Sequence, residues 1–306
     1  MAFTLQKQDY EFIKHFAEYR ILSVAQLAAV FRKSEAVIRR RCRELKKEGL
    51  IQAINNKLVQ DLGRPKSFFA LTERGVDILR VKALIGEDML YENVGPVSNR
   101  LIDHQLLVNW FRIHLNEIDK VQSSPTLKFW SYNSPFVPRK EDGSLIITDY
   151  SSIGRITVRQ VRFTPDAMFI MTNATGDKSM LFFLEADCGT ETLSSPQCDI
   201  SDIRQKILNY QWYFQTLKYK RYEGIFKVPF LHGFRVLFLA KTVGRLAALC
   251  KLTQQMAPTP FICLTEQQRL FEDGVFAKIW ARGGNLQVMQ RSIIGRMHCR
   301  TPLAQR

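Results

Sequence analysis

The chain has 306 residues, of which 46% are hydrophobic and 24% are charged, so it is long enough for two domains with buried cores. No run of about 18 apolar residues occurs, which argues against a membrane span, and six scattered cysteines without a Cys-x-x-Cys pair argue against disulfides or a zinc site. Lysine and arginine outnumber aspartate and glutamate by 44 to 29, a formal net charge of +15. We expect a cytoplasmic protein with a polyanionic partner and no membrane contact.

Apolar residues at helical spacing predict three helices at the start of the chain, over 9–20, 24–31 and 35–48. Ser23 and Ser34 precede the second and third helices as N-caps. The buried stripe predicted for the third helix consists of Val37, Ile38, Cys42 and Leu45.

The opposite face of the third helix is strongly basic, because residues 32–47 hold eight basic and two acidic side chains. Two β-prone runs, 50–54 and 67–71, surround a basic loop, and a further helix is predicted over 76–83. This order resembles a winged helix-turn-helix domain over residues 1–85, a fold whose third helix enters the major groove of DNA. A winged helix that contacts proteins is the alternative. The residues expected to bind double-stranded DNA are Arg39, Arg40, Arg43, Lys46, Lys47, Lys57, Arg64 and Lys66.

Residues 86–100 are predicted to be a linker and residues 101–285 an α/β (α+β) domain with a central mixed sheet. The expected helices are 100–120, 199–220 and 243–256, and the expected strands are 127–132, 154–163, 167–172, 179–186, 234–240 and 261–265. Residues 286–306 form a basic C-terminal tail with no acidic side chain after Arg291.

Three carboxylates stand at strand ends in this second domain. Asp166 opens one predicted strand, and Glu185 and Asp187 close the next on the same face. Carboxylates brought together repel one another unless a cation lies between them, and oxygen ligands suit Mg²⁺ or Mn²⁺. The sequence therefore predicts that Asp166, Glu185 and Asp187 hold a catalytic metal ion that can activate water against a phosphodiester.

The pattern resembles the PD-(D/E)xK phosphodiesterase superfamily, which includes the restriction endonucleases. Asp187 stands where that motif has lysine, which puts ordinary nuclease chemistry in doubt. In some members of the superfamily the lysine lies on the following helix, and here that helix contains Lys206 and, one turn later, Tyr210. The resemblance thus implies catalytic roles for Lys206 and Tyr210 beside the carboxylates.

A more specific resemblance rests on the run Glu-x-Asp-x-Gly-Thr-Glu at 185–191, the upstream sequence His104-Gln-Leu-Leu-Val-Asn, and the winged helix. Together they resemble the replication-relaxation family, which includes plasmid mobilisation relaxases of the non-HUH type. The resemblance spans about residues 8–240. It implies a sequence- or structure-specific DNA-binding protein with metal-dependent nicking activity in the replication or transfer of a plasmid or mobile element.

A second function stays open at this point. The chain could be a non-enzymatic DNA-binding regulator or replication-accessory protein with a degenerate nuclease-like domain, and the missing lysine at 187 favours that alternative. A homodimer and separate ATPase or transfer proteins are compatible partners, since the chain has no phosphate-binding P-loop of its own.

Aromatic and basic residues alternate between Trp212 and Lys227, a mixture suited to stacking on single-stranded DNA. The alternative is that most of these rings are core residues: Trp212, Tyr213, Phe214, Tyr219 and Tyr222.

Overall fold

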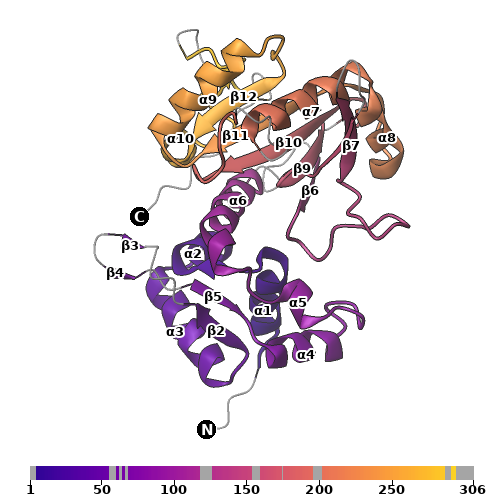
Figure 1. Cartoon of the computed structure of the whole chain (residues 1–306). Helices are drawn as coiled ribbons and strands as arrows, with labels where there is room; N and C mark the ends of the chain where they lie inside the picture. Colours follow the sequence, from indigo (N-terminus) through magenta and orange to yellow (C-terminus); the bar gives the residue numbers. More distant parts are fainter. Residues whose placement is uncertain are drawn as a thin grey trace. The chain divides into compact units, whose positions relative to one another are not determined.

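The chain forms two compact units, which are described separately (Figure 1). The first contains residues 1–113 and 133–137, and the second contains residues 114–132 and 138–306. The computed structural model describes residues 5–54, 60–61, 64–65, 68–117, 126–153, 159–173, 175–195, 202–286 and 291–293.

The first unit begins as a winged helix-turn-helix. Its elements are α1 (Lys7–Tyr19), β1 (Leu22–Ser23), α2 (Val24–Phe31), α3 (Glu35–Lys47), β2 (Ile51–Ile54), β3 (Gln60–Asp61), β4 (Arg64–Pro65), β5 (Phe68–Leu71) and α4 (Glu73–Val81). Strand β5 lies between β1 and β2 in an antiparallel sheet, and β3 pairs with β4. The predicted fold class is confirmed for this part of the chain.

Local chemistry explains where the first helices begin. The Ser23 hydroxyl accepts a hydrogen bond of 3.1 Å from the Gln26 amide, and the Gln26 side chain accepts one from the Ser23 amide, which together form a capping box. Ser34 precedes α3 without a side-chain cap. Val37 was expected in the buried stripe of α3, but it is 40% exposed and faces a hollow between α1 and α3.

The segment 86–100 contains α5 (Tyr91–Val94) and the start of η1 (Asn99–Leu101) where the sequence predicted a linker. The next helix, α6 (Ile102–Leu115), groups with the first unit as far as Ile113, whereas the sequence placed it in the second domain. The reason is a set of amide hydrogen bonds. Asn109 Nδ2 donates to the Tyr19 and Ile21 carbonyls, at 3.2 and 2.6 Å, and Gln26 donates to the carbonyl of Leu106.

The second unit is built on a mixed six-stranded sheet with the order β13-β12-β11-β10-β9-β6. Its strands are β6 (Thr126–Ser131), β9 (Ala167–Thr172), β10 (Ser179–Asp187), β11 (Leu231–Ala240), β12 (Ile262–Glu266) and β13 (Ala281–Arg282). Strand β11 runs parallel to both of its neighbours, β10 and β12. Strand β9 runs antiparallel to both of its neighbours, β6 and β10. This is the mixed sheet that the sequence predicts.

Helices α7 (Ile203–Gln215) and α9 (Val243–Gln255) connect the parallel strands and lie over the sheet (Figure 1). Both crossovers run in the same direction along the sheet, so right-handed connections place both helices on one face. The remaining helical elements are η3 (Lys218–Lys220), α8 (Arg221–Phe226) and α10 (Gln267–Asp273). Among the described residues no helix combines the length and apolar character that crossing a bilayer requires.

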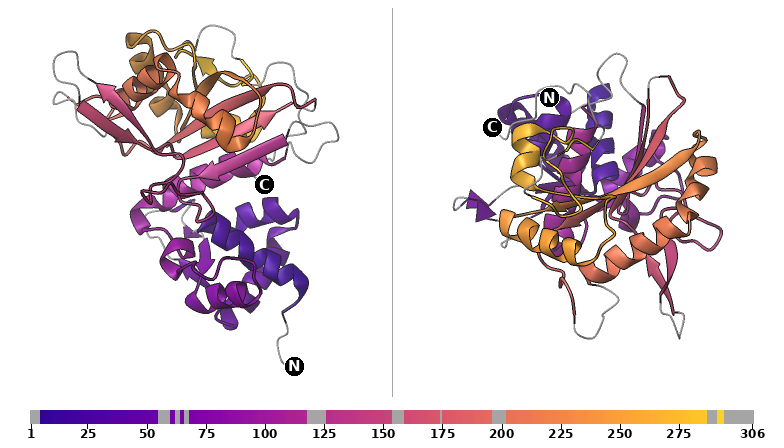
Figure 2. Two further views of the ribbon diagram at one scale, coloured as in Figure 1. Left: turned by 90° about the vertical axis from the view of Figure 1, so that its right-hand side faces the viewer. Right: turned by 90° about the horizontal axis from the view of Figure 1, so that it is seen from above.

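A two-stranded ribbon lies apart from the large sheet, formed by β7 (Asp149–Ile153) and β8 (Arg159–Phe163) (Figure 2). The sequence predicts a strand over 154–163, of which 154–158 lie outside the described residues. The ribbon is attached to α7, because the Ser151 hydroxyl donates to Asn209 Oδ1 at 2.7 Å.

Candidate functional site

The end of β10 and one face of α7 bring together three of the five residues expected to be catalytic. Glu185 is 4% exposed, and each of its carboxylate oxygens accepts a hydrogen bond from α7. The Tyr210 hydroxyl donates to Oε1 at 2.5 Å, and the Lys206 ammonium donates to Oε2 at 3.1 Å. The predicted one-turn spacing of Lys206 and Tyr210 therefore places both side chains on the same carboxylate.

The turn after β10 brings a second carboxylate, that of Glu191, into contact with Lys206. Gly189 has φ +83°, a left-handed conformation that favours glycine, and its amide donates to Asp187 Oδ1 at 2.7 Å. The turn brings Glu191 back towards α7, where its Oε1 accepts a hydrogen bond of 2.9 Å from Lys206. The Gly-Thr-Glu part of the sequence motif thus directs a half-exposed carboxylate towards Lys206. We call Asp166, Glu185, Glu191, Lys206 and Tyr210 the Glu185 centre.

Asp166 belongs to the centre through the neighbouring strand. It precedes β9, and its Oδ2 accepts a hydrogen bond of 2.8 Å from the Ala186 amide on β10. This bond holds the carboxylate beside Glu185, and its negative charge raises the pKa values of both Glu185 and Lys206.

Burial and charge set the protonation of the centre. Burial raises the pKa of Glu185 to about 7, although the Lys206 ammonium acts in the opposite direction. Burial alone would lower the pKa of Lys206, but the surrounding carboxylates raise it above its ordinary value. Burial and the adjacent Glu185 raise the pKa of Tyr210 well above its ordinary range. Burial thus favours the neutral forms of Glu185 and Tyr210, whereas the carboxylates favour the charged form of Lys206.

The sequence predicts a metal ion as the partner of Asp187, but in the structure its partner is Arg245. Asp187 is 4% exposed, and its Oδ2 accepts a hydrogen bond of 2.9 Å from Arg245 Nε at the start of α9. Arg245 also donates to the Glu191 carbonyl at 2.6 Å. Arg245 was not among the predicted site residues, because it lies 58 residues from Asp187 in the sequence. Its one sequence signal is its place three residues after Thr242, the N-cap of the next crossover helix.

The predicted three-carboxylate metal site does not fit this arrangement. The described residues contain no group of three or more His, Cys, Asp or Glu side chains arranged to hold a metal ion, and Asp187 pairs with Arg245, a cation on α9 outside the Glu185 centre. Asp166 and Glu185 remain as candidate ligands, and Mg²⁺ is often held by one or two carboxylates together with substrate phosphates. The Mg²⁺ or Mn²⁺ ion stays a prediction on this smaller ligand set.

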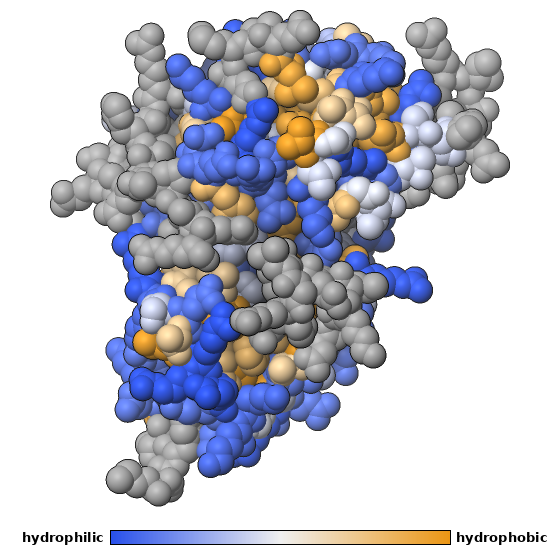
Figure 3. Space-filling view, turned by 90° about the vertical axis from the view of Figure 1, so that its left-hand side faces the viewer, coloured by the Kyte–Doolittle hydropathy of each residue, from blue (hydrophilic) through white to orange (hydrophobic). Residues whose placement is uncertain are grey.

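The basic face of α3 is exposed as expected, while Ile38, Cys42 and Leu45 are buried. The exposed residues are Arg39, Arg40, Arg43, Lys46 and Lys47. The side of the first unit drawn in Figure 3 is predominantly hydrophilic. Of the predicted wing residues, Lys57 and Lys66 lie outside the described residues, and for Arg64 only the backbone, in β4, is described.

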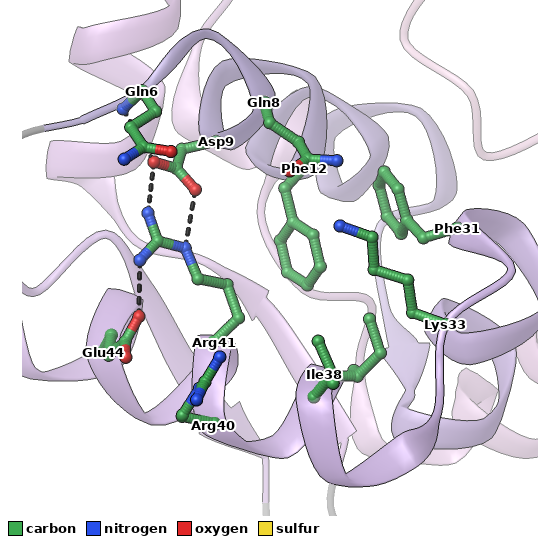
Figure 4. A pocket seen from close by; sticks show the side chains of 11 residues that line it. Gln6, Gln8, Asp9, Phe12, Phe31, Lys33, Ile38, Arg40, Arg41 and Glu44 are labelled. Carbon is green, nitrogen blue, oxygen red and sulfur yellow. Dashed lines mark hydrogen bonds and ion pairs between the residues drawn. The ribbon is translucent and has the colours of Figure 1, made fainter.

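Arg41 has a structural role instead. It donates to Asp9 on α1 and to Glu44 on α3, beside the hollow that Phe12 and Phe31 line (Figure 4). The upstream motif residues Gln105 and Asn109 are structural as well, since they bond to each other at 2.8 Å and Asn109 bonds to the backbone before β1.

Comparisons with known proteins identify one family. The replication-relaxation family model matches residues 13–228, and no curated protein matches the chain. Three solved structures illustrate its likeness to winged-helix proteins. A ZitR mutant from Lactococcus lactis is 18% identical, over 27% of this chain and 53% of that chain, with a TM-score of 0.23.

A protein with a GntR-superfamily winged-helix domain from Halomicrobium mukohataei is 27% identical, over 26% of this chain and 59% of that chain, with a TM-score of 0.22. PadR from Bacillus subtilis, in complex with operator DNA, is 16% identical, over 38% of this chain and 69% of that chain, with a TM-score of 0.23. The chain thus spans little more than half the length of the first two proteins, and TM-scores this low carry no argument about function.

Proposed function

The chain belongs to the replication-relaxation family, and we propose that it binds double-stranded DNA through its winged helix and nicks DNA at the Glu185 centre. It would act as a relaxase-like endonuclease in the replication or transfer of a plasmid or other mobile element. The observation that carries the proposal is the bond between Lys206 and Glu185. This bond supplies, from α7, the cation that the PD-(D/E)xK pattern otherwise takes from the position of Asp187.

Each residue of the centre has a defined part in this proposal. Lys206 places a positive charge at the surface edge of the site, where it can stabilise the charge that grows on the phosphoryl oxygens. Tyr210 donates to Glu185 Oε1 and holds the carboxylate in one orientation. Asp166 and Glu185 would hold a Mg²⁺ or Mn²⁺ ion, which when bound would activate water. Glu191 keeps Lys206 in position when DNA is absent.

The basic face of α3 supports the DNA-binding part of the proposal. Five exposed lysine and arginine side chains lie on the helix that enters the major groove in winged-helix proteins. Phosphate contacts from such a face give affinity and set the position of the protein, and base contacts give specificity.

The test is a nicking assay on supercoiled plasmid in Mg²⁺, in Mn²⁺ and in EDTA, with Asp166→Ala as the control variant. We expect open-circular product from the wild type in at least one metal, and none in EDTA or from the variant. Intact plasmid under all conditions would contradict the enzymatic proposal.

One observation favours a second candidate, a DNA-binding replication-accessory protein without nuclease activity. Arg245 neutralises Asp187 inside the fold, so one of the three expected carboxylates is used for structure. Under this alternative the wild type and Asp166→Ala bind the same duplex with equal affinity and neither nicks it.

A further inference from the structure

Exposed rings and lysines gather where α7 ends and η3 begins. Leu217 and Phe230 are 50% and 52% exposed, and Trp212, on α7, is half-buried. Three other rings of this segment, Tyr213, Tyr219 and Tyr222, are buried. The aromatic run therefore divides into a core set and an outward set.

The outward rings are paired with lysines. Lys218 Nζ lies 4.5 Å from the centroid of the Trp212 ring, and Lys220 Nζ lies 4.2 Å from the centroid of the Phe230 ring. His232 extends the surface, with its ring 4.7 Å from that of Phe230 and at 79° to it. We call Trp212, Leu217, Lys218, Lys220, Phe230 and His232 the stacking surface.

The fold holds this surface in place from below. Tyr219 lies between the two lysines in the sequence and is 2% exposed, with its ring against Phe214 and Phe234. Beside the buried Tyr219, Lys218 is exposed and Lys220 is half-buried. Within the described part of the chain neither lysine forms an ion pair with a carboxylate, so their charge is available to an external anion.

We infer that the stacking surface binds single-stranded DNA, with bases on the rings of Trp212 and Phe230 and phosphates at Lys218 and Lys220. Base faces are free to stack on protein rings only in a single strand, and alternating rings and cations suit a chain of alternating bases and phosphates. The inference rests on the proposed function, because nicking frees a strand end that has to be held. Trp212, the first residue of the stacking surface, follows Lys206 on α7, about 9 Å further along the helix axis at 1.5 Å per residue.

The experiment measures binding of a fluorescent oligothymidylate of about 12 nucleotides to the full chain, in a salt titration. All proteins carry Arg40→Ala and Arg43→Ala, so that the basic face of α3 contributes little. The test variants are Phe230→Leu, Phe230→Tyr and the double variant Lys218→Ala/Lys220→Ala. Phe136→Leu and Lys251→Ala are matched controls, because Phe136 is 38% exposed and Lys251 is exposed on α9.

We expect Phe230→Leu to weaken binding by roughly five- to hundredfold, the loss of one stacked base, and Phe230→Tyr to restore it. The lysine double variant should lower the salt slope by about 1.4 units, at about 0.7 per phosphate contact on a single strand. The controls should bind as their parent does. Equal affinity and salt slope for parent and test variants would overturn the inference.

The nicking assay separates this inference from the proposed function. If the wild type nicks plasmid while the test variants keep full oligothymidylate affinity, only the inference fails. If the wild type does not nick but its oligothymidylate binding depends on Phe230 and the two lysines, the inference stands and the nuclease proposal fails.

Discussion

The Tyr210 hydroxyl donates a 2.5 Å hydrogen bond to the buried carboxylate of Glu185. The tyrosine is a donor in this pair, because its own pKa is raised well above the ordinary range by burial and by Glu185. A phenol that keeps its proton is a poor nucleophile towards phosphorus. We therefore expect hydrolysis by water and no covalent tyrosine intermediate.

Tyr210→Phe should accordingly keep much of the nicking rate, since the ring still packs against Phe163 and Phe183. Tyr210→Ala should lower the free energy of unfolding by about 3–5 kcal/mol, because it leaves a large cavity. The check is a nicking time course together with denaturing electrophoresis of the protein–DNA mixture. A denaturation-resistant adduct in the wild type that is lost in Tyr210→Phe would refute hydrolysis.

The raised pKa of Glu185 predicts a pH-dependent stability. Its folded-state pKa of about 7 exceeds the ordinary value of 4.5, so between these values the folded protein binds more protons than the unfolded chain. Stability contributed by this group is complete below about pH 4.5 and is lost as the pH rises to about 7. We expect the free energy of unfolding of the wild type, relative to Glu185→Gln, to fall across this window in EDTA.

The comparison with Glu185→Gln is needed because His114 acts in the opposite direction. Burial lowers the pKa of His114 to about 4, so its contribution is lost on acidification, equally in both proteins. A difference between the two proteins that does not change from pH 4.5 to 7 in urea titrations would show that Glu185 keeps an ordinary pKa.

The exposed face of α3 should dominate affinity for duplex DNA. Arg40→Ala with Arg43→Ala should weaken duplex binding at least roughly tenfold and lower the salt slope by roughly one to two units. Lys82→Ala is the control, because Lys82 is not part of α3. Its ammonium lies over the Tyr10 ring, 5.4 Å from the centroid. An unchanged salt titration for the double variant would refute α3 as the recognition helix.

The Asp187–Arg245 pair should stabilise the second unit. Arg245→Met leaves a carboxylate that is 4% exposed without its cation, which should cost about 3–5 kcal/mol of unfolding free energy. Asp187→Asn combined with Arg245→Met should cost less than the sum of the single changes. Additive costs in a urea-denaturation cycle would mean that the two side chains do not interact in solution.

Much of the Glu185 centre could be predicted from local spacing. The four-residue step from Lys206 to Tyr210 places both side chains on one face of α7, and the two-residue step from Glu185 to Asp187 places both on one face of β10. The three-residue separation of Ser23 and Gln26 indicates the capping box of α2 in the same way. Asp187 lies two residues after Glu185 on β10 and pairs with Arg245. Its partner could not be predicted, because Arg245 arrives from the next crossover and only the sheet order β10-β11-β12 brings it close.

Other differences also have long-range causes. Strand β7 was not expected because Asp149-Tyr-Ser-Ser-Ile is short and polar, and its position depends on Asn209 of α7. Helix α6 was assigned to the second domain because its amphipathic pattern does not reveal which core it joins. The deciding contacts are amide bonds from Asn109 to backbone carbonyls 88 and 90 residues away.

The most direct test of the central claim compares two variants that each remove one cation from the end of β10. Lys206→Met takes the cation from Glu185, and Arg245→Met takes it from Asp187. Nicking rates on supercoiled plasmid are measured at saturating protein, after both variants are shown to be folded and to bind duplex DNA. The account predicts a loss of about 10²–10³-fold for Lys206→Met, the cost of one preorganised donor, and a near-normal rate for folded Arg245→Met. Equal nicking by Lys206→Met and the wild type would contradict it.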